Sequence, residues 1–153
     1  MKTKLFISLF LIGFVQIQAV EINYGQDLYP SALYGEWRIT KYTRLPGSDL
    51  PQDDITQNIS RHVLLRKGSI QVDSMIVHDP IYRVLQENTA DFLKLEYHTT
   101  PQKLGITDKS ITVVVVTTGA KSEYPNVTVN FLVINKDEII VPFEGVFFYL
   151  QRV

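Results

Sequence analysis

The sequence contains no cysteine, and this absence excludes several kinds of site at once. Without cysteine there is no disulfide framework, no thiolate metal site, no cysteine nucleophile and no cysteine for lipid attachment. The stability of the 153-residue chain therefore has to come from a hydrophobic core. Because 45% of the residues are hydrophobic and only 20% are charged, we expect one compact globular domain with such a core.

An excess of positive charge is also lacking, since the formal net charge is −1 at pH 7. Two of the 15 basic residues, Lys2 and Lys4, precede residue 20, so the remainder has 13 basic against 16 acidic residues and a net charge of −3. A nucleic-acid-binding protein needs a basic face that neutralises phosphates. The composition therefore argues against a nucleic-acid partner.

No hydrophobic run is long enough to cross a bilayer. The run from Leu5 to Val15 has about eleven residues, whereas a membrane-spanning helix needs about twenty. It follows two lysines and precedes Ala19, a small residue at a cleavage position, which is the pattern of a secretory signal peptide. We therefore expect residues 1–19 to be removed and residues 20–153 to form a single exported domain, periplasmic or secreted, with no membrane span after cleavage.

Short stretches rich in β-branched and aromatic residues recur at intervals of about ten residues, which is typical of an antiparallel sheet. We expect strands over residues 35–42, 62–66, 69–77, 81–85, 111–118, 127–134 and 139–152, the last interrupted at 144–145. With the interrupted last stretch counted as two, these give about eight strands, accompanied by one or two short helices. The sequence therefore predicts an all-β fold, an antiparallel barrel or sandwich.

Local signals refine this pattern. Lys67-Gly68 predicts a tight hairpin turn in which glycine supplies a positive φ. In the strand that follows, we expect Ile70, Val72 and Ile76 to share one face and Met75 to lie on the other.

Helices are expected in fewer places. Pro51 at the first helical position, followed by Asp53 and Asp54, predicts a short helix that ends near Ser60. The segment 87–97 is compatible with either helix or strand.

The two ends of the expected sheet carry a family resemblance. The first strand contains Gly35-x-Trp37, and the last strand ends on Arg152. This pairing resembles the lipocalins and the wider calycin superfamily, which are eight-stranded up-and-down barrels. The resemblance implies that Trp37 plugs one end of the barrel, that Gly35 allows a close approach before it, and that Arg152 covers it. An arginine plane over an indole contributes about 0.5–2 kcal/mol.

The chain departs from a full lipocalin in three ways. A helix is expected after the first strand, the cysteines of many lipocalins are missing, and no flanking C-terminal helix is evident. A reduced calycin is therefore the closer description. The sequence also resembles small exported bacterial proteins of unassigned function, a resemblance that implies no activity.

Candidate binding residues follow from the barrel geometry. Residues with the parity of Trp37 point inward, so we expect Ile39 in the core and Lys41 near the open end, either contacting a ligand or extending its ammonium group to solvent. The less regular middle of the chain would frame the mouth of the barrel, where tyrosine and arginine suit recognition. Single tyrosines there also fit as core residues. The candidates for ligand or partner binding in this region are Tyr82, Arg83, Tyr97 and His98.

Catalytic templates are missing from the sequence. It has no His-Glu-x-x-His, no Gly-x-Ser-x-Gly, no phosphate-binding Gly-x-x-x-x-Gly-Lys and no Gly-x-Gly-x-x-Gly. The three histidines, His62, His78 and His98, lack the close spacing of metal ligands. We therefore expect no enzymatic activity, no metal and no cofactor. The triplets that begin at Asn58 and Asn126 match the glycosylation pattern, which has no meaning in a bacterial host.

The function expected from these observations is that of an exported binding protein that holds a small apolar or amphipathic ligand in its barrel. The alternative is a protein-binding module, such as an inhibitor of a periplasmic hydrolase or an immunity-type partner. The bulk of the barrel interior distinguishes the two. Phe131, Phe143, Phe148 and the valine run at 113–116 are large enough to fill a small barrel, which would favour the protein-binding alternative.

Overall fold

The computed structural model describes residues 30–153, so the expected signal peptide, residues 1–19, lies outside the described residues. The described chain forms nine strands and four short helices. Their bounds are η1 Pro30–Leu33, β1 Gly35–Arg44, α2 Gln52–Asn58, β2 His62–Arg66, β3 Ser69–Val72, β4 Met75–His78, β5 Ile81–Asn88, α3 Thr89–Tyr97, α4 Pro101–Leu104, β6 Ser110–Thr117, β7 Thr128–Asn135, β8 Glu138–Phe143 and β9 Val146–Arg152.

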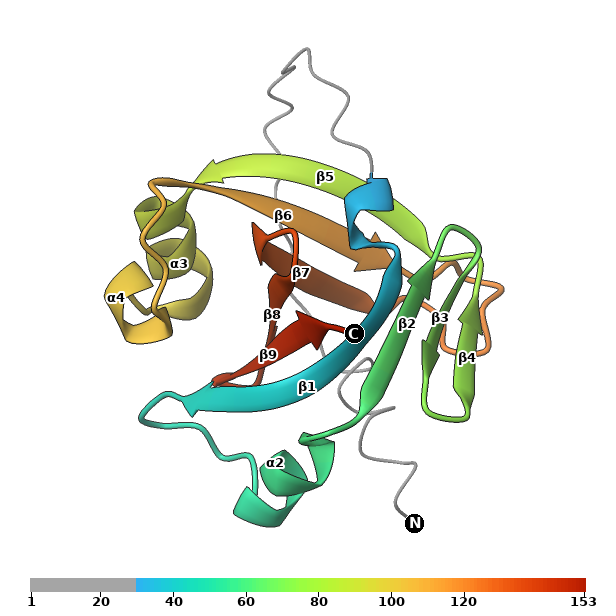
Figure 1. Ribbon diagram of the computed structural model, residues 1–153, viewed down its shortest axis with the longest axis horizontal. Helices are drawn as coiled ribbons and strands as arrows, with labels where there is room; N and C mark the ends of the chain where they lie inside the picture. Colours follow the sequence, from blue (N-terminus) through green and yellow to red (C-terminus); the bar gives the residue numbers. More distant parts are fainter. Residues whose placement is uncertain (1–29) are drawn as a thin grey trace.

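All nine strands belong to one antiparallel sheet, in the order β4-β3-β2-β1-β9-β8-β7-β6-β5. Consecutive strands pair with each other except for β4 and β5, and the first strand, β1, pairs with the last, β9. The sheet curls into a half-barrel (Figure 1), and its edge strands β4 and β5 are not hydrogen-bonded to each other. The prediction of an all-β antiparallel fold with few short helices is confirmed, with nine strands in place of about eight.

The additional strand comes from a turn within residues 69–77. Asp73 adopts a positive φ of 50°, which aspartate tolerates, and Val72 pairs with Met75 across the turn. After this reversal Met75 is buried and Ile76 is 40% exposed. The expectation that Ile76 shares the buried face is therefore wrong, because an unbroken strand was assumed where the chain turns back.

Hairpin turns join most of the neighbouring strands. The predicted hairpin at Lys67-Gly68 is confirmed by the pairing of Arg66 with Ser69. The expected positive φ at Gly68 is wrong. The left-handed backbone conformation occurs instead in the turn between β8 and β9, at Glu144 and Gly145, with φ values of 46° and 76°.

The helix predicted after Pro51 is confirmed as α2, although Pro51 is the residue that precedes the helix, not its first residue. The segment 87–97 contains the end of β5 and then α3. Asn88 ends the strand and caps the helix, because its side-chain oxygen accepts a hydrogen bond from the backbone N–H of Asp91 at 3.0 Å.

The sheet has a hydrophobic core on each face. The inner core, enclosed by the curl, includes Trp37, Phe131 and Phe148, and the outer core lies between the other face of β6–β9 and the short helices α3 and α4. Side chains alternate between the faces of a strand, so Val114 and Val116 enter the inner core. Val113 and Val115 enter the outer core. Because β6 has a hydrophobic core on each face, all four consecutive valines are buried.

Candidate functional site

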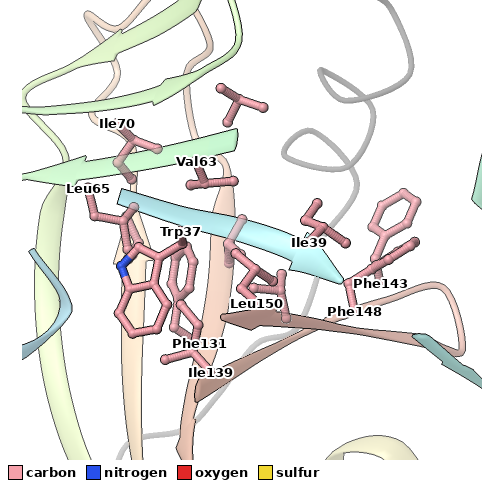
Figure 2. Close-up of a cluster of buried hydrophobic side chains, with 14 of the residues drawn as sticks. Trp37, Ile39, Val63, Leu65, Ile70, Phe131, Ile139, Phe143, Phe148 and Leu150 are labelled. Carbon is pink, nitrogen blue, oxygen red and sulfur yellow. The ribbon is translucent and has the colours of Figure 1, made fainter. Parts of the chain in front are cut away.

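The inner core is filled with large side chains. Figure 2 shows buried side chains from β1, β2, β3, β7, β8 and β9 gathered in one cluster that includes Trp37. Trp37, Phe131 and Phe148 are 0% exposed, and Phe143 is buried beside them. A side chain without accessible surface touches no space large enough for a water molecule, whether that space is inside or outside the protein. The aromatic side chains at the centre of the half-barrel therefore pack against protein atoms on all sides.

One end of the inner core is closed by Trp37 and Arg152. These residues pair across β1 and β9, and the guanidinium carbon of Arg152 lies 4.2 Å from the centre of the Trp37 ring. The indole Nε1 donates to the carbonyl oxygen of Leu33 at 2.8 Å. Arg152 donates to the carbonyl oxygens of Tyr34 and Ala32 at 2.9 and 2.7 Å. The arginine thus ties η1 to the ring while satisfying backbone acceptors.

Gly35 has the conformation that this arrangement requires. Its φ is +136°, a region that side chains rarely adopt, and a Cβ atom placed on it would lie 2.7 Å from Nη1 of Arg152. A side chain at this position would therefore displace the guanidinium from the indole.

The other end of the inner core is covered by α2 and the residues before it, which lie opposite η1 in Figure 1. Leu50 and Ile55 are buried in the inner core. Asn58 is also buried, and its amide nitrogen donates to the carbonyl oxygen of Asp54 at 2.7 Å. The Oδ1 atom of Asn58 has no hydrogen-bond partner among the described residues. Burial excludes Asn58 as a glycan acceptor in the folded chain, whereas Asn126 is exposed.

Lys41 does not lie on the face predicted for it. A β-bulge between Ile39 and Lys41 shifts the register, so that Ile39 pairs with Leu150 but Lys41 pairs with Tyr149. Leu150 belongs to the inner core and Tyr149 to the outer core. The expectation that Lys41 shares the inward face of Trp37 is therefore wrong, because the extra residue inverts the alternation. Lys41 is exposed, and its ammonium nitrogen lies 4.6 Å from the centre of the Tyr149 ring.

Tyr82 and Arg83, both on β5, point to opposite faces of the sheet. Tyr82 packs against the inner core, its ring is edge-on to that of Tyr34 at 5.9 Å, and its hydroxyl donates to the carbonyl oxygen of Arg66 at 2.7 Å. Burial raises the pKa of Tyr82 above the usual value, and the neighbouring Tyr34 adds to the shift. Tyr82 thus links β5 to β2 across the open side of the half-barrel. Arg83 is exposed.

Tyr97 is the last residue of α3 and belongs to the outer core. Its ring is edge-on to the rings of Phe92 and Phe147, and its hydroxyl accepts a hydrogen bond from the Asn130 amide nitrogen at 2.8 Å. Burial raises the pKa of Tyr97 to about 12, although the hydrogen bond from Asn130 by itself lowers this pKa. His98 follows in the left-handed conformation with φ 52° and is exposed.

The five predicted binding residues therefore do not form one mouth. Lys41, Tyr97 and His98 are associated with the outer face, and Tyr82 reaches the inner core. Two polar residues of the outer core, Asn130 and Tyr149, were not predicted from the sequence. Tyr149 donates to the carbonyl oxygen of Leu104 at 2.8 Å. A polar residue within an apolar strand, such as Asn130, can be recognised in the sequence. Only the pairing of β7 shows that Asn130 lies on the outer face of the sheet.

Residues 30–153 lack two further features. No group of three or more histidine or acidic side chains is arranged to hold a metal ion. None of the helices in this part of the chain combines the length and the apolar character needed to cross a membrane.

Comparison with known proteins yields no relative of this chain: no family model matches the sequence, and neither a curated protein nor a solved structure matches it significantly.

Proposed function

We propose that this chain is an exported, non-enzymatic module that binds another protein, such as a hydrolase inhibitor or an immunity-type partner. The export step rests on the basic, apolar and small-residue order of residues 1–19. The binding step rests on the geometry of the half-barrel.

The filled inner core is the observation that carries this proposal. A barrel that holds a small ligand keeps an internal space lined by small or polar groups. Here Trp37, Phe131 and Phe148 are completely buried, and η1 and α2 cover opposite ends of the same core. Recognition by such a protein is favoured at its surface rather than in its interior.

The outer face around α3 is the surface that best suits a protein partner. Leu95 on α3 is 74% exposed, whereas Phe92 and Leu93 on the same helix are buried. Lys41 and His98 are exposed polar groups on the same side of the sheet. In the proposed contact Leu95 is the apolar anchor, and Lys41 and His98 supply polar groups on the same side of the sheet.

The proposal keeps the calycin resemblance as a statement about architecture. The pairing of β1 with β9, the up-and-down order of the strands and the stacking of Arg152 on Trp37 support a reduced calycin. The open side between β4 and β5 and the nine strands are departures from that pattern.

A small apolar or amphipathic ligand is the second candidate, and one observation favours it. The buried Oδ1 atom of Asn58, in the helix that covers the inner core, has no partner among the described residues. A buried acceptor without a donor costs about 1–3 kcal/mol. Asn58 is 0% exposed, so a bound molecule with a hydroxyl or amide donor would satisfy this acceptor only after α2 moves away from the inner core.

Native mass spectrometry of the full chain, purified from the compartment to which its own host exports it, separates the two candidates. We expect a second protein to be retained in fixed stoichiometry. Leu95→Arg should abolish its retention, because a charge then occupies the apolar contact. Lys67→Glu, in the hairpin between β2 and β3, is the matched control and should leave retention unchanged.

A small molecule retained in fixed stoichiometry without a second protein would refute the protein-binding proposal and support the ligand candidate. Asn58→Leu should then release that molecule, because it removes the acceptor.

A further inference from the structure

The strand β5 forms an open edge of the sheet. It is eight residues long and pairs with β6 on one side only. Among the described residues, no backbone group of β5 forms a hydrogen bond on its other side. The 3-10 helix η1 approaches β5 near Tyr82, where the Tyr34 and Tyr82 rings meet. An edge strand of this length presents a row of free donors and acceptors, a template for another strand.

On the outer face of the sheet, β5 carries two opposite charges that are four residues apart. Arg83 and Glu87 have the same parity, and Leu85 lies between them. Neither Arg83 nor Glu87 forms an ion pair with any residue in 30–153. Ile81, on the same face, is 60% exposed. No proline lies within β5, and its two charges are of opposite sign, so they complement each other in a suitably paired second copy.

The spacing of these charges selects one way for the strand to pair with itself. In a two-fold symmetric antiparallel pair, the residue at the axis lies opposite its own copy. Centring the pair on Arg83 or on Glu87 sets like charges opposite each other, and centring it on 84 or 86 leaves both charges opposite uncharged residues. Centring it on Leu85 sets Arg83 opposite Glu87 of the second copy, twice.

From the free edge and this charge complementarity we infer that two copies of the chain associate through β5, with residues 83–87 of both copies pairing antiparallel about Leu85. The two sheets then form one continuous sheet, with a reciprocal Arg83–Glu87 pair on each side of the axis. Each copy has one β5, so the association closes at two copies. The inference does not depend on the proposed function.

The absence of cysteine allows a direct test of the register. In the full processed chain, Arg83→Cys and Glu87→Cys are prepared separately and oxidised alone and as a mixture. Opposite residues in an antiparallel pair have Cβ atoms roughly 4.5–5.5 Å apart, whereas residue 83 lies about 13 Å along the strand from its own copy. We expect disulfide-linked dimers in the mixture at least tenfold faster than in either variant alone.

Charge reversal tests the energetics independently of the disulfide. Sedimentation equilibrium of the purified protein should show a concentration-dependent dimer. Arg83→Glu should raise its dissociation constant by about tenfold, because two attractive pairs become repulsive. The double variant Arg83→Glu with Glu87→Arg should return the dissociation constant to within about threefold of the wild-type value. Lys103→Glu, an exposed reversal on α4, is the matched control and should change nothing.

Three results would overturn the inference. The first is a wild-type chain that sediments as a monomer at all concentrations. The second is a dimer that responds to Arg83→Glu no more than to Lys103→Glu. The third is a cysteine mixture that cross-links no faster than its components. Circular dichroism of every variant separates loss of pairing from loss of folding.

Discussion

At the scale of single residues, one arginine joins three parts of the chain. Arg152 contacts the Trp37 ring and donates to carbonyl oxygens in and beside η1, and its Nε donates to the carbonyl oxygen of Lys136 at 2.8 Å. Arginine suits this position because its donors are spread around a plane that can also stack on an indole. The family resemblance singled out Gly35, Trp37 and Arg152, but the backbone acceptors could be identified only from the tertiary structure.

Gly35→Ala should reduce the free energy of unfolding by about 2–4 kcal/mol. The added Cβ meets the Arg152 guanidinium at 2.7 Å and occupies a φ of +136° that alanine disfavours. Urea denaturation followed by tryptophan fluorescence measures the change. Gly119→Ala is the matched control, because a Cβ there meets nothing within 4 Å, and it should change the free energy by less than about 0.5 kcal/mol. Equal losses in both variants would contradict the close approach of Arg152 to Gly35.

A second prediction at this scale concerns pH. The pKa of Tyr97 is about 12 in the folded chain and 10.0 for an ordinary tyrosine. Between these values the unfolded chain loses the phenolic proton and the folded chain keeps it, so stability falls as pH rises from 10 to 12. In Tyr97→Phe this part of the decrease should be absent. Urea denaturation at a series of alkaline pH values measures how the free energy of unfolding changes with pH. If this change is the same in Tyr97→Phe as in the wild-type chain, Tyr97 is not the group responsible.

At the scale of elements, single residues decide which face of a strand becomes buried. The bulge before Lys41 moves that side chain to the outer face, and the turn at Asp73 exposes Ile76 and buries Met75. Alternation in the sequence predicts faces only while the strand is unbroken. Both departures arise from where neighbouring strands pair, which a pattern of period two does not contain.

The start of α3 allows a prediction for an element. Asn88→Ala removes the side-chain oxygen that accepts from the Asp91 N–H, and we expect a loss of about 1 kcal/mol in the free energy of unfolding. Thr100→Ala is the matched control, because Thr100 precedes α4 without a side-chain capping bond. This substitution should lower the free energy of unfolding by less than about 0.5 kcal/mol. Thermal or urea denaturation compares the two. A cost for Thr100→Ala as large as that for Asn88→Ala would mean that the capping bond is not the cause.

At the scale of the whole molecule, the sheet separates two cores. The inner core contains the only tryptophan and is covered by η1 and α2, and the outer core is covered by α3 and α4. Strands β6–β9 are therefore apolar on both faces. Both proposals therefore place recognition at the surface, one at the open edge of the sheet and the other on its outer face.

A filled inner core predicts how the molecule responds when a large side chain is removed. Phe131→Ala should lower the free energy of unfolding by about 3–5 kcal/mol and create an apolar cavity that binds benzene, detected as a rise in Tm on adding benzene. Leu95→Ala, at an exposed site, is the control and should show neither effect. A comparable benzene-induced rise in Tm for the wild-type chain would show that an internal space already exists.

By itself the sequence determined the fold class, the helix after Pro51, the hairpin at Lys67-Gly68 and the presence of a large apolar core. These features depend on local turn chemistry and on the periodicity of apolar residues, which neighbouring residues carry. The tertiary structure alone decided the gap between β4 and β5, the faces of Lys41 and Met75, and the covering of one end of the inner core by α2. Each of these depends on pairing or packing between residues far apart in the chain, and such contacts leave no trace in a local pattern.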